Sequence, residues 1–467
     1  MPFAKTGGLG DVAGALPKAL IGTGEVDASL IMPLYEGTDR RLLREMLFDN
    51  LEVEWTGGNR FVRVFLNEET IGAPAFLIDA PEYFARPSVY GYRDDHERYA
   101  FFCRAALALL KRLGRPPDIV HGNDWPCGFA IAELIARRAS DDFYGGTRTV
   151  FSLHNLAYQG GFDPRDLGWL GFGWGEVHDA FLSDGAASAL KAGLMLSDVL
   201  STVSRRYSFE IQTSAQGYGL DWLLRMRRDR LIGVTNGVDY DAWNPATDPH
   251  IAANFSADDL SGKLACKLDL LKRFSLPPEP ERPVIAIISR LVAQKGYDLI
   301  REAAPAILET GAFFIALGAG AQEYEDFLQS FHEHAPHRVG IYKGYAGEPL
   351  AHQIEAGADM FLMPSLYEPC GLNQMYSMRY GTVPIVRATG GLDDTVENFD
   401  RARGSGNGFK FDDYTSQAML GSIYEALFAY ADKGNWRRLQ QNGMRADNSW
   451  DAAARKYVEV YRTVASM

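Results

Sequence analysis

The residues best suited to chemistry gather in the stretch from Ser365 to Asp394, SLYEPCGLNQMYSMRYGTVPIVRATGGLDD. We predict a loop that carries Glu368, followed by a helix opening at Pro369-Cys370-Gly371. A buried strand from Val383 to Val386 then leads to a second helix at Gly390-Gly391. Helix N-termini present unpaired amide groups and a positive dipole end, which suit an anion or a sugar hydroxyl. The stretch therefore suits a phosphorylated sugar held by backbone amides, with Glu368 accepting hydrogen bonds from ring hydroxyls.

Two cations follow another predicted strand. Val284 to Ile288 is a continuous apolar run, and Arg290 and Lys295 come just beyond its end, before a helix that begins near Tyr297. A planar guanidinium together with a compact ammonium suits a pyrophosphate bridge and its departure. The alternative is a loop with two surface cations, which is common in proteins.

Near the N-terminus, Lys5 begins the sequence Lys-Thr-Gly-Gly-Leu-Gly-Asp-Val. We predict a glycine-rich loop that leads into a helix with apolar positions at Val12, Leu16 and Leu20. Such a loop allows backbone amides to approach a phosphate, and Lys5 adds a full positive charge. Taken alone, a lysine beside paired glycines more often marks a simple turn.

Polar residues end two further predicted strands. The short strand Asp118 to His121 ends in Gly122-Asn123-Asp124-Trp125, and the strand Thr149 to Leu153 ends in His154. In open α/β sheets the carboxyl ends of the strands face the ligand crevice. A neutral imidazole there could hydrogen-bond a sugar hydroxyl and stabilise developing positive charge through its dipole. A lone histidine after a strand is usually structural, so this pattern by itself does not decide between the two roles.

Together these motifs closely resemble the bacterial glycogen synthase and plant starch synthase family, glycosyltransferase family 5. The matching sequences are K-T-G-G-L-G-D-V, H-N-L-A-Y-Q-G, R-L-x-x-Q-K-G, E-P-C-G-L and T-G-G-L, and the resemblance runs over essentially the whole chain. Asn123 stands where the family has a histidine in its H-D-W element, whereas Asp124 is kept. Gly390-Gly391 alone would indicate only turn residues. In the family a strand precedes the lysine loop, but only four residues precede Lys5 here, so we expect a poorly fixed Lys5 and a less stable chain.

The resemblance also implies which residues act. In the family the lysine contacts ADP-glucose, the histidine lies against the transferred glucose, and a tyrosine lies on the adenine side. The residues assigned to catalysis are His154, Asp124, Arg290, Lys295 and Glu368. Those assigned to the donor are Lys5, Gly8, Asp11, Asn236, Arg290, Lys295, Tyr345, Glu368, Cys370, Gly371, Leu372, Gly390 and Gly391.

Strands and helices alternate in two series, which predicts an α/β protein with two doubly wound parallel sheets. The first series has strands at Ala28–Met32, Arg60–Leu66, Ala75–Ile78, Asp118–His121, Thr149–Leu153, Val199–Val203 and Leu231–Thr235, with helices at 95–113 and 186–196. The second has strands at Val284–Ile288, Ala312–Leu317, Val339–Tyr342, Met360–Met363 and Val383–Val386. The resemblance implies a GT-B glycosyltransferase. Its acceptor-side domain would span 1–240, with the helix at 450–467 packing back on it, its nucleotide-sugar domain 241–449, and its site the cleft between them.

The resemblance implies transfer of glucose from ADP-glucose to the non-reducing 4-hydroxyl of an α-1,4-glucan, with retention of configuration. Retaining hydrolases use two carboxylates, one of them the nucleophile. Related retaining transferases often have a second glutamate eight residues after the first, where this chain has Tyr376. We therefore favour front-side displacement, in which the departing diphosphate helps to deprotonate the acceptor hydroxyl and the cations stabilise the leaving charge.

Three alternatives stay open at this point. A related GT-B transferase could use UDP-glucose or another acceptor. A phosphorylase of the same architecture would need a lysine-bound pyridoxal phosphate. A non-catalytic protein that binds glucan is the rival from a different class, although the full set of motif residues speaks against it.

Composition limits the partners. The 467 residues carry 47 basic and 60 acidic side chains and a net charge of −13, which argues against nucleic acid and anionic membrane as partners. No apolar run is long enough to cross a bilayer and no signal-peptide pattern is present, so we expect a cytoplasmic protein. The four cysteines show no metal-binding spacing, and we expect neither a metal nor another cofactor. The sequence leaves the oligomeric state open.

Overall fold

The computed structural model describes residues 2–173, 175–344 and 347–467. The chain forms two compact units, Met1–Gly237 with Trp450–Met467 and Val238–Ser449. Among the described residues, no helix combines the length and the apolar character needed to cross a membrane.

The second unit is built on one six-stranded sheet in the order β14-β13-β12-β15-β16-β17, with every neighbouring pair parallel. Its strands are β12 (Val284–Ile288), β13 (Phe313–Gly318), β14 (Val339–Lys343), β15 (Met360–Met363), β16 (Val383–Arg387) and β17 (Phe409–Phe411). Its helices are α10 (Ser261–Arg273), α11 (Tyr297–Glu309), α12 (Gln322–His334), α13 (Glu348–Gly357), α14 (Asn373–Arg379), α15 (Gly390–Thr395), α16 (Ser416–Ala431) and α17 (Lys433–Arg445).

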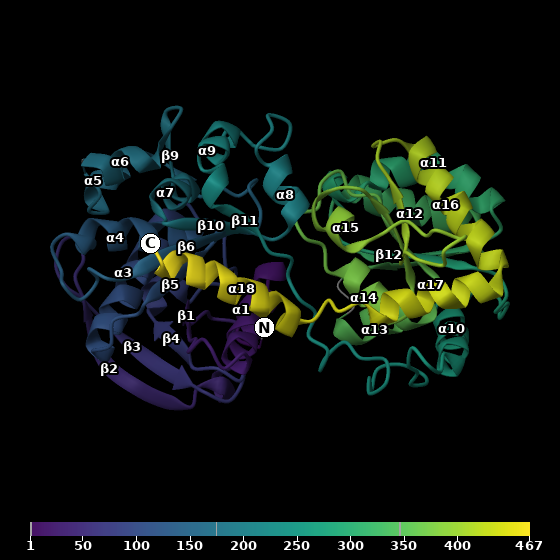
Figure 1. Cartoon of the computed structure of the whole chain (residues 1–467), viewed down its shortest axis with the longest axis horizontal. Coiled ribbons are helices and arrows are strands. Elements are labelled where there is room, and N and C mark those ends of the chain that lie inside the picture. The colour runs from purple at the N-terminus through teal and green to yellow at the C-terminus, as the bar shows by residue number, and fades with distance from the viewer. Residues whose placement is uncertain (1, 174, 345–346) are drawn as a thin grey trace. The chain divides into compact units, whose positions relative to one another are not determined.

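The central strand β12 shows why this sheet is buried on both faces. Ile285 and Ile287 belong to a core that includes side chains of α11 and α16, whereas Val284 and Ala286 belong to a second core with side chains of α10 and α13. A parallel strand covered by helices on both faces needs an uninterrupted apolar sequence, which is the pattern that predicted it. Figure 1 shows β12 among the helices of this unit.

The first unit has two four-stranded sheets, β11-β10-β6-β5 and β1-β4-β3-β2, and a small sheet β7-β9-β8. Its strands are β1 (Leu30–Pro33), β2 (Glu45–Val53), β3 (Arg60–Asn67), β4 (Ala75–Asp79), β5 (Ile119–Asn123), β6 (Arg148–Leu153), β7 (Gly161–Phe162), β8 (Leu182–Ser183), β9 (Ala186–Ser188), β10 (Val199–Thr202) and β11 (Leu231–Gly233). The β11-β10-β6-β5 sheet is wholly parallel, whereas β2, β3 and β4 pair antiparallel. The sequence did not predict β2, whose pairing with β3 contains register shifts that interrupt the alternating pattern.

The helices of the first unit are α1 (Gly8–Gly22), α2 (Pro81–Phe84), α3 (Asp95–Leu113), α4 (Gly128–Arg138), α5 (Asp166–Trp169), α6 (Gly175–Phe181), α7 (Ala189–Leu196), α8 (Arg205–Glu210), α9 (Asp221–Met226) and α18 (Trp450–Ala465). Four helices of the first unit, α1, α3, α7 and α18, were predicted from the sequence, and the others were not. The prediction of one helix over 186–196 is wrong in its first turn, because residues 186–188 form β9. Ser188 caps α7 by accepting a hydrogen bond from the Lys191 amide, which fixes the helix start.

The last helix belongs to the first unit. Its side chains share a core with Val12, Leu16 and Leu20 of α1, the three positions predicted to be apolar. Figure 1 shows α18 in yellow beside α1 in purple. This packing joins the two ends of the chain in one core.

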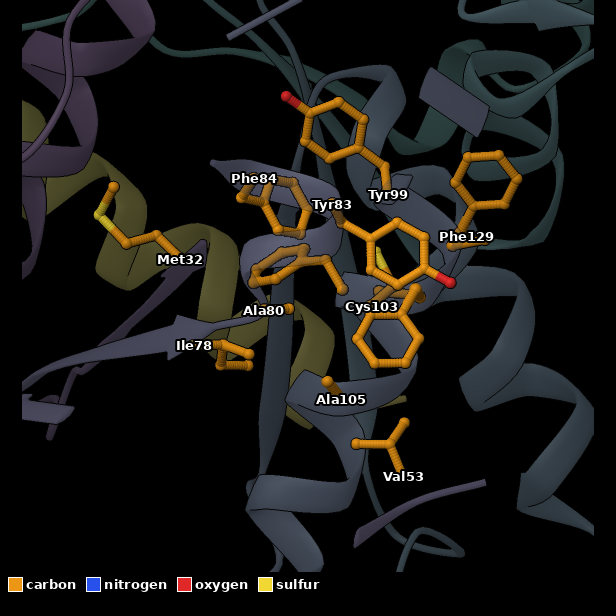
Figure 2. Close-up of a cluster of buried hydrophobic side chains, with 14 of the residues drawn as sticks. Met32, Val53, Ile78, Ala80, Tyr83, Phe84, Tyr99, Cys103, Ala105 and Phe129 are labelled. Atoms are coloured by element: carbon orange, nitrogen blue, oxygen red, sulfur yellow. The ribbon is translucent and has the colours of Figure 1, made fainter. Parts of the chain in front are cut away.

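A larger core lies between α3, α4 and the β1-β4-β3-β2 sheet. Figure 2 shows Tyr83 and Phe84 of α2 among side chains from α3, α4 and the strands. The ring of Tyr83 stacks on that of Phe101 at a centroid distance of 4.6 Å. Aromatic pairs of this kind contribute about 0.5–1.5 kcal/mol each beyond the area that they bury.

Candidate active site

A pocket of about 200 Å³ lies at the carboxyl ends of β12 and β15 in the second unit. It brings together five of the predicted residues, Arg290, Lys295, Glu368, Gly371 and Leu372. The other residues that line it are Ile287, Ile288, Ser289, Leu362, Met363, Ser365 and Asn373. Residues seventy and more positions apart thus form one cavity, as expected for loops that follow parallel strands of one sheet.

Arg290 supplies an uncommitted positive charge to this pocket. The loop that carries it is held by Leu291, which is fully buried and whose amide donates to the Ala319 carbonyl at 2.9 Å. The Arg290 side chain is exposed, and its guanidinium makes no hydrogen bond or ion pair with any residue that the structure describes. A cation in this state can accept an anionic ligand without first breaking a contact.

Lys295 and Glu368 form a direct ion pair across the pocket. Lys295 Nζ lies 2.5 Å from Glu368 Oε2, and Ser365 Oγ donates to the same oxygen at 3.0 Å. The two side chains are only 17% and 9% exposed. Glu368 Oε1 has no hydrogen bond to a described residue, so the carboxylate is held in place with one oxygen available to a ligand hydroxyl.

Hydrogen bonds between the two loops fix this geometry. The Leu366 amide donates to the Gln294 carbonyl at 2.8 Å, and Gln294 Nε2 donates to the Tyr367 carbonyl at 3.1 Å. Asn373 Nδ2 donates to the Ile288 carbonyl at 2.8 Å and so ties α14 to the end of β12. No role for Gln294 or Asn373 was predicted from the sequence. Their only sequence signal is their position within or directly after the motifs that carry Lys295 and Glu368.

The prediction that a helix opens at Pro369-Cys370-Gly371 is wrong. α14 begins at Asn373 and has seven residues, and α15 has six. The amides of residues 369–371 therefore belong to a loop, since Leu372 is the residue that precedes the helix. Two helices this short have small dipoles, so the charges of the pocket come mainly from Arg290, Lys295 and Glu368.

Gly390 and Gly391 hold the Glu368 loop rather than lining the pocket. Both are buried and neither is a lining residue. A Cβ atom at Gly390 would lie 1.9 Å from the Glu368 carbonyl oxygen, and one at Gly391 would lie 2.0 Å from the Cys370 carbonyl oxygen. The Gly391 amide donates to the Glu368 carbonyl at 3.2 Å. The glycines thus allow a close backbone approach that supports Glu368 from behind.

The first unit brings Asn123, Asp124 and His154 together at the carboxyl ends of β5 and β6. The His154 amide donates to Asp124 Oδ1 at 2.7 Å, and His154 Nε2 lies 2.9 Å from Asn123 Oδ1. With Asn123 in this orientation, Nε2 carries the proton and Nδ1 is an acceptor. Asp124 has φ = 57°, a strained conformation for a residue with a side chain. The asparagine in place of the family's histidine therefore serves as a hydrogen-bond partner for His154.

Burial shifts the pKa of both ionisable groups in this trio. It lowers the pKa of His154 below its usual value, although the nearby Asp124 opposes this shift. It raises the pKa of Asp124, while hydrogen bonds from the backbone of His154 and Asn155 and the charge of His154 act in the other direction. Both shifts arise because burial disfavours the charged form. His154 is therefore a neutral imidazole at neutral pH.

The other residues that were predicted to bind the sugar-nucleotide donor come from other parts of the sequence. Lys5 Nζ pairs with Asp11 Oδ1 at 2.6 Å, with 43% of the lysine side chain exposed. Gly8 is open, with no atom close to the position of a Cβ. Asn236 is buried, and its Oδ1 has no partner among the described residues. Tyr345 lies outside the described residues, and the predicted opposition of Lys5 and His154 to Arg290 stays a prediction.

Within 2–173, 175–344 and 347–467, no three His, Cys, Asp or Glu side chains come together in a way that could hold a metal ion.

Comparison with families and proteins of known identity gives matches along the chain. Residues 1–226 match the starch synthase catalytic domain, and residues 270–439 match the glycosyl transferases group 1 family. The chain is 44% identical to a glycogen synthase of Koribacter versatilis over 99% of its own length and 96% of that protein. It is 46% identical to a glycogen synthase of Anaeromyxobacter dehalogenans strain 2CP-1, over 99% of this chain and 97% of that protein.

Solved structures give matching results. The catalytic domain of starch synthase IV from Arabidopsis thaliana, bound to ADP and acarbose, superposes with a TM-score of 0.91 at 35% identity. That match covers 100% of this chain and 97% of the other. A sucrose-phosphate synthase from Thermosynechococcus elongatus gives a TM-score of 0.57 at 17% identity over 97% and 92% of the two chains, a likeness of fold alone.

Proposed function

Because this chain belongs to the family of glycogen and starch synthases and shares their GT-B fold, we propose that it transfers glucose from ADP-glucose to the non-reducing 4-hydroxyl of an α-1,4-glucan. The chain is a glycosyltransferase, and the resemblance and fold class predicted from the sequence are confirmed. The donor, the acceptor and retention of configuration are the parts that we propose.

The observation that carries this proposal is the guanidinium of Arg290, which has no partner among the described residues and lies in the same pocket as the Lys295–Glu368 pair. A sugar diphosphate ester needs a cation for the diphosphate and an acceptor for the sugar hydroxyls. Arg290 suits the first need because its planar fork matches phosphate oxygens. Glu368 suits the second through Oε1. The starch synthase IV structure contains ADP, which supports adenosine as the nucleoside of the donor.

Lys295 has two tasks in this proposal. Its ion pair holds Glu368 where a sugar ring can reach the free oxygen. As the bond between the sugar and the diphosphate breaks, negative charge develops on the diphosphate, and the Lys295 ammonium can also attract this leaving group. Preorganised charges of this kind stabilise the transition state more than the ground state, because they require no rearrangement during the reaction.

We propose front-side displacement as the mechanism. Glu368 is the one carboxylate among the described residues that line the pocket, and its Oε2 is already engaged by Lys295 and Ser365. A double displacement would require a carboxylate that attacks the sugar carbon, whereas we assign the remaining oxygen of Glu368, Oε1, to the sugar hydroxyls. We infer instead that the departing diphosphate accepts the proton of the acceptor 4-hydroxyl while the new glycosidic bond forms on the same face. For His154 we propose contact with the transferred glucose as a neutral imidazole.

The decisive experiment offers radiolabelled ADP-glucose or UDP-glucose with glycogen and counts label in the polymer. We expect label from ADP-glucose in large excess over UDP-glucose, removable by a hydrolase specific for α-1,4 bonds. A chelator should leave the rate unchanged, because we propose no role for a metal. Equal or greater transfer from UDP-glucose would reject the proposed donor, and label resistant to the α-1,4-specific enzyme would reject the proposed linkage.

A further inference from the structure

The chain passes between its two units twice, at the two ends of Val238–Ser449. We call residues 238–244 and 444–449, which lie just inside the second unit, the linking segments. The Val238 amide donates to the Asn448 carbonyl at 2.7 Å. This hydrogen bond ties the two linking segments to each other within the second unit.

The short helix α14 reaches from the pocket to the linking segments. Leu372 directly precedes it and Asn373 is its first residue, and both line the pocket. Asn373 Nδ2 also donates to the Ile288 carbonyl at 2.8 Å. Seven helical residues span about 10 Å at 1.5 Å per residue, and the helix ends at Arg379. A ligand in the pocket would therefore lie at one end of α14, and the linking segments contact the other end.

Arg379 contacts both linking segments. Its guanidinium carbon stands 4.3 Å from the centre of the Tyr240 ring, and its Nη2 donates to Asn244 Oδ1 at 3.3 Å. Its Nη1 lies 3.5 Å from the Met444 carbonyl oxygen. A guanidinium stacked on an aromatic ring is fixed in its plane as well as in its position. Because Tyr240 and Asn244 belong to the first linking segment and Met444 to the second, one side chain joins α14 to both.

A stack of three rings makes a second contact between α14 and the first linking segment. The Trp243 ring lies between the rings of Tyr376, on α14, and His352, on α13. Both centroid distances are 3.8 Å, and the interplanar angles are 4° and 19°. Asp248 Oδ2 lies 2.7 Å from His352 Nδ1, and these two side chains are 0% and 2% exposed. The buried pair fixes the His352 ring, so Trp243 packs on a rigid surface on one side and on α14 on the other.

The stack also shows how Tyr376 is used. Tyr376 stands where related transferases often have a second glutamate. It is not among the described residues that line the pocket, and its ring packs on Trp243 instead. In this chain the position therefore contributes a contact to the linking segment rather than a carboxylate to the pocket.

We propose that Trp243 and Arg379 are positioning residues for glucosyl transfer, which act on the pocket through α14. Closely packed side chains transmit displacements because they leave little free space. When either contact is lost, the C-terminal end of α14 shifts, and Asn373 and the loop that carries Glu368 shift with it. A displacement of about 1 Å can lower a rate by about 10²-fold, even when the changed residue is far from the reacting atoms.

This inference rests on the proposed function only for the choice of donor. Its test compares Trp243→Leu and Arg379→Met with the wild type in transfer of label to glycogen from ADP-glucose and from UDP-glucose. Phe331→Leu is the matched control, since it removes a buried aromatic ring, 5% exposed, from α12 of the same unit. The Tm of each variant measures its loss of stability, and rates are compared at a temperature at which every variant is folded.

With the donor that the wild type uses, kcat should fall about tenfold or more in Trp243→Leu and in Arg379→Met. Trp243→Phe should recover most of the rate, because it keeps a ring that can stack on Tyr376. Phe331→Leu should lower Tm without such a fall in kcat. Transfer from UDP-glucose alone would reject the proposed donor, and the variants are then compared with UDP-glucose.

Hydrogen exchange provides a readout that needs no donor. The amides of α14 should exchange faster in Trp243→Leu and Arg379→Met than in the wild type and in Phe331→Leu. Folded Trp243→Leu and Arg379→Met variants with either wild-type kcat or wild-type exchange in α14 would overturn the inference. Equal changes of kcat and exchange in Phe331→Leu would also overturn it, because they would then reflect a general loss of stability.

Discussion

Replacing Arg290 with alanine should abolish most of the transfer activity while leaving the fold intact. One unit charge about 4 Å from a phosphate oxygen contributes about 4 kcal/mol at an effective dielectric constant of about 20. Removal of one preorganised donor to a developing anion lowers kcat by about 10² to 10³-fold, or about 3–4 kcal/mol. Because the Arg290 guanidinium has no partner among the described residues, nothing else in the protein should respond to its loss. We therefore expect a fall in kcat of this size for Arg290→Ala.

The stability of the same variant makes the prediction specific. Exposed side chains without contacts change the free energy of unfolding by about 0.5 kcal/mol or less, which is about 1–2 °C in Tm. Lys295→Ala should behave differently, because it leaves the 9%-exposed carboxylate of Glu368 without the ammonium at 2.5 Å. Breaking such a pair costs up to about 3–5 kcal/mol when it is fully buried, and less here because Lys295 is partly exposed. Lys295→Ala should thus lose both activity and Tm.

The assay measures initial rates with labelled ADP-glucose and glycogen, together with thermal unfolding of each variant. Arg403→Ala is a matched control, since it removes an arginine of the same unit whose side chain is 83% exposed. Arg290→Lys should recover part of the rate because it restores the charge without the planar fork. A kcat for Arg290→Ala within threefold of the wild type, or a fall in its Tm as large as that of Lys295→Ala, would contradict this role of Arg290.

Three further predictions concern a glycine behind the pocket, a buried carboxyl group and the partner of His154. Gly391→Ala should lower both kcat and Tm, because its Cβ would lie 2.0 Å from the Cys370 carbonyl oxygen. Its control is Gly421→Ala, which lies in helix α16 with open space around the Cβ position. Gly421→Ala should raise the free energy of unfolding by about 0.5–1 kcal/mol in urea. Burial raises the pKa of Glu355 to about 8. The free energy of unfolding should therefore fall as pH rises from about 4.5 to about 8, by at most about 1.4 kcal/mol per pH unit. In urea titrations at pH 5 to 8, Glu355→Gln should show a smaller dependence of this free energy on pH. Asn123→Ala removes the partner of His154 Nε2 at 2.9 Å, so it should lower kcat with little change in Tm. Unchanged kinetics would exclude a positioning role for Asn123.

Much of the fold follows from local sequence. The apolar runs at β12 and β15 predicted both strands with the bounds that the structure shows, because a strand buried on both faces must be apolar throughout. The helix α3 also has its predicted bounds, since its apolar face repeats with the helical period. The same local signals failed for β2, whose register shifts break the alternation of side chains, and for the start of α14.

What the sequence determined by itself is therefore the order of the elements and the residue types placed after each strand, since both depend on short-range patterns. Only the tertiary structure decided how those residues are used. It paired Lys295 with Glu368, left Arg290 without a partner among the described residues, and placed Gly391 behind the Glu368 loop. These outcomes depend on the approach of backbone segments that are tens of residues apart. A motif fixes which groups are present, but the distances between them, and hence their charges and hydrogen bonds, arise only when the sheet brings its loops together.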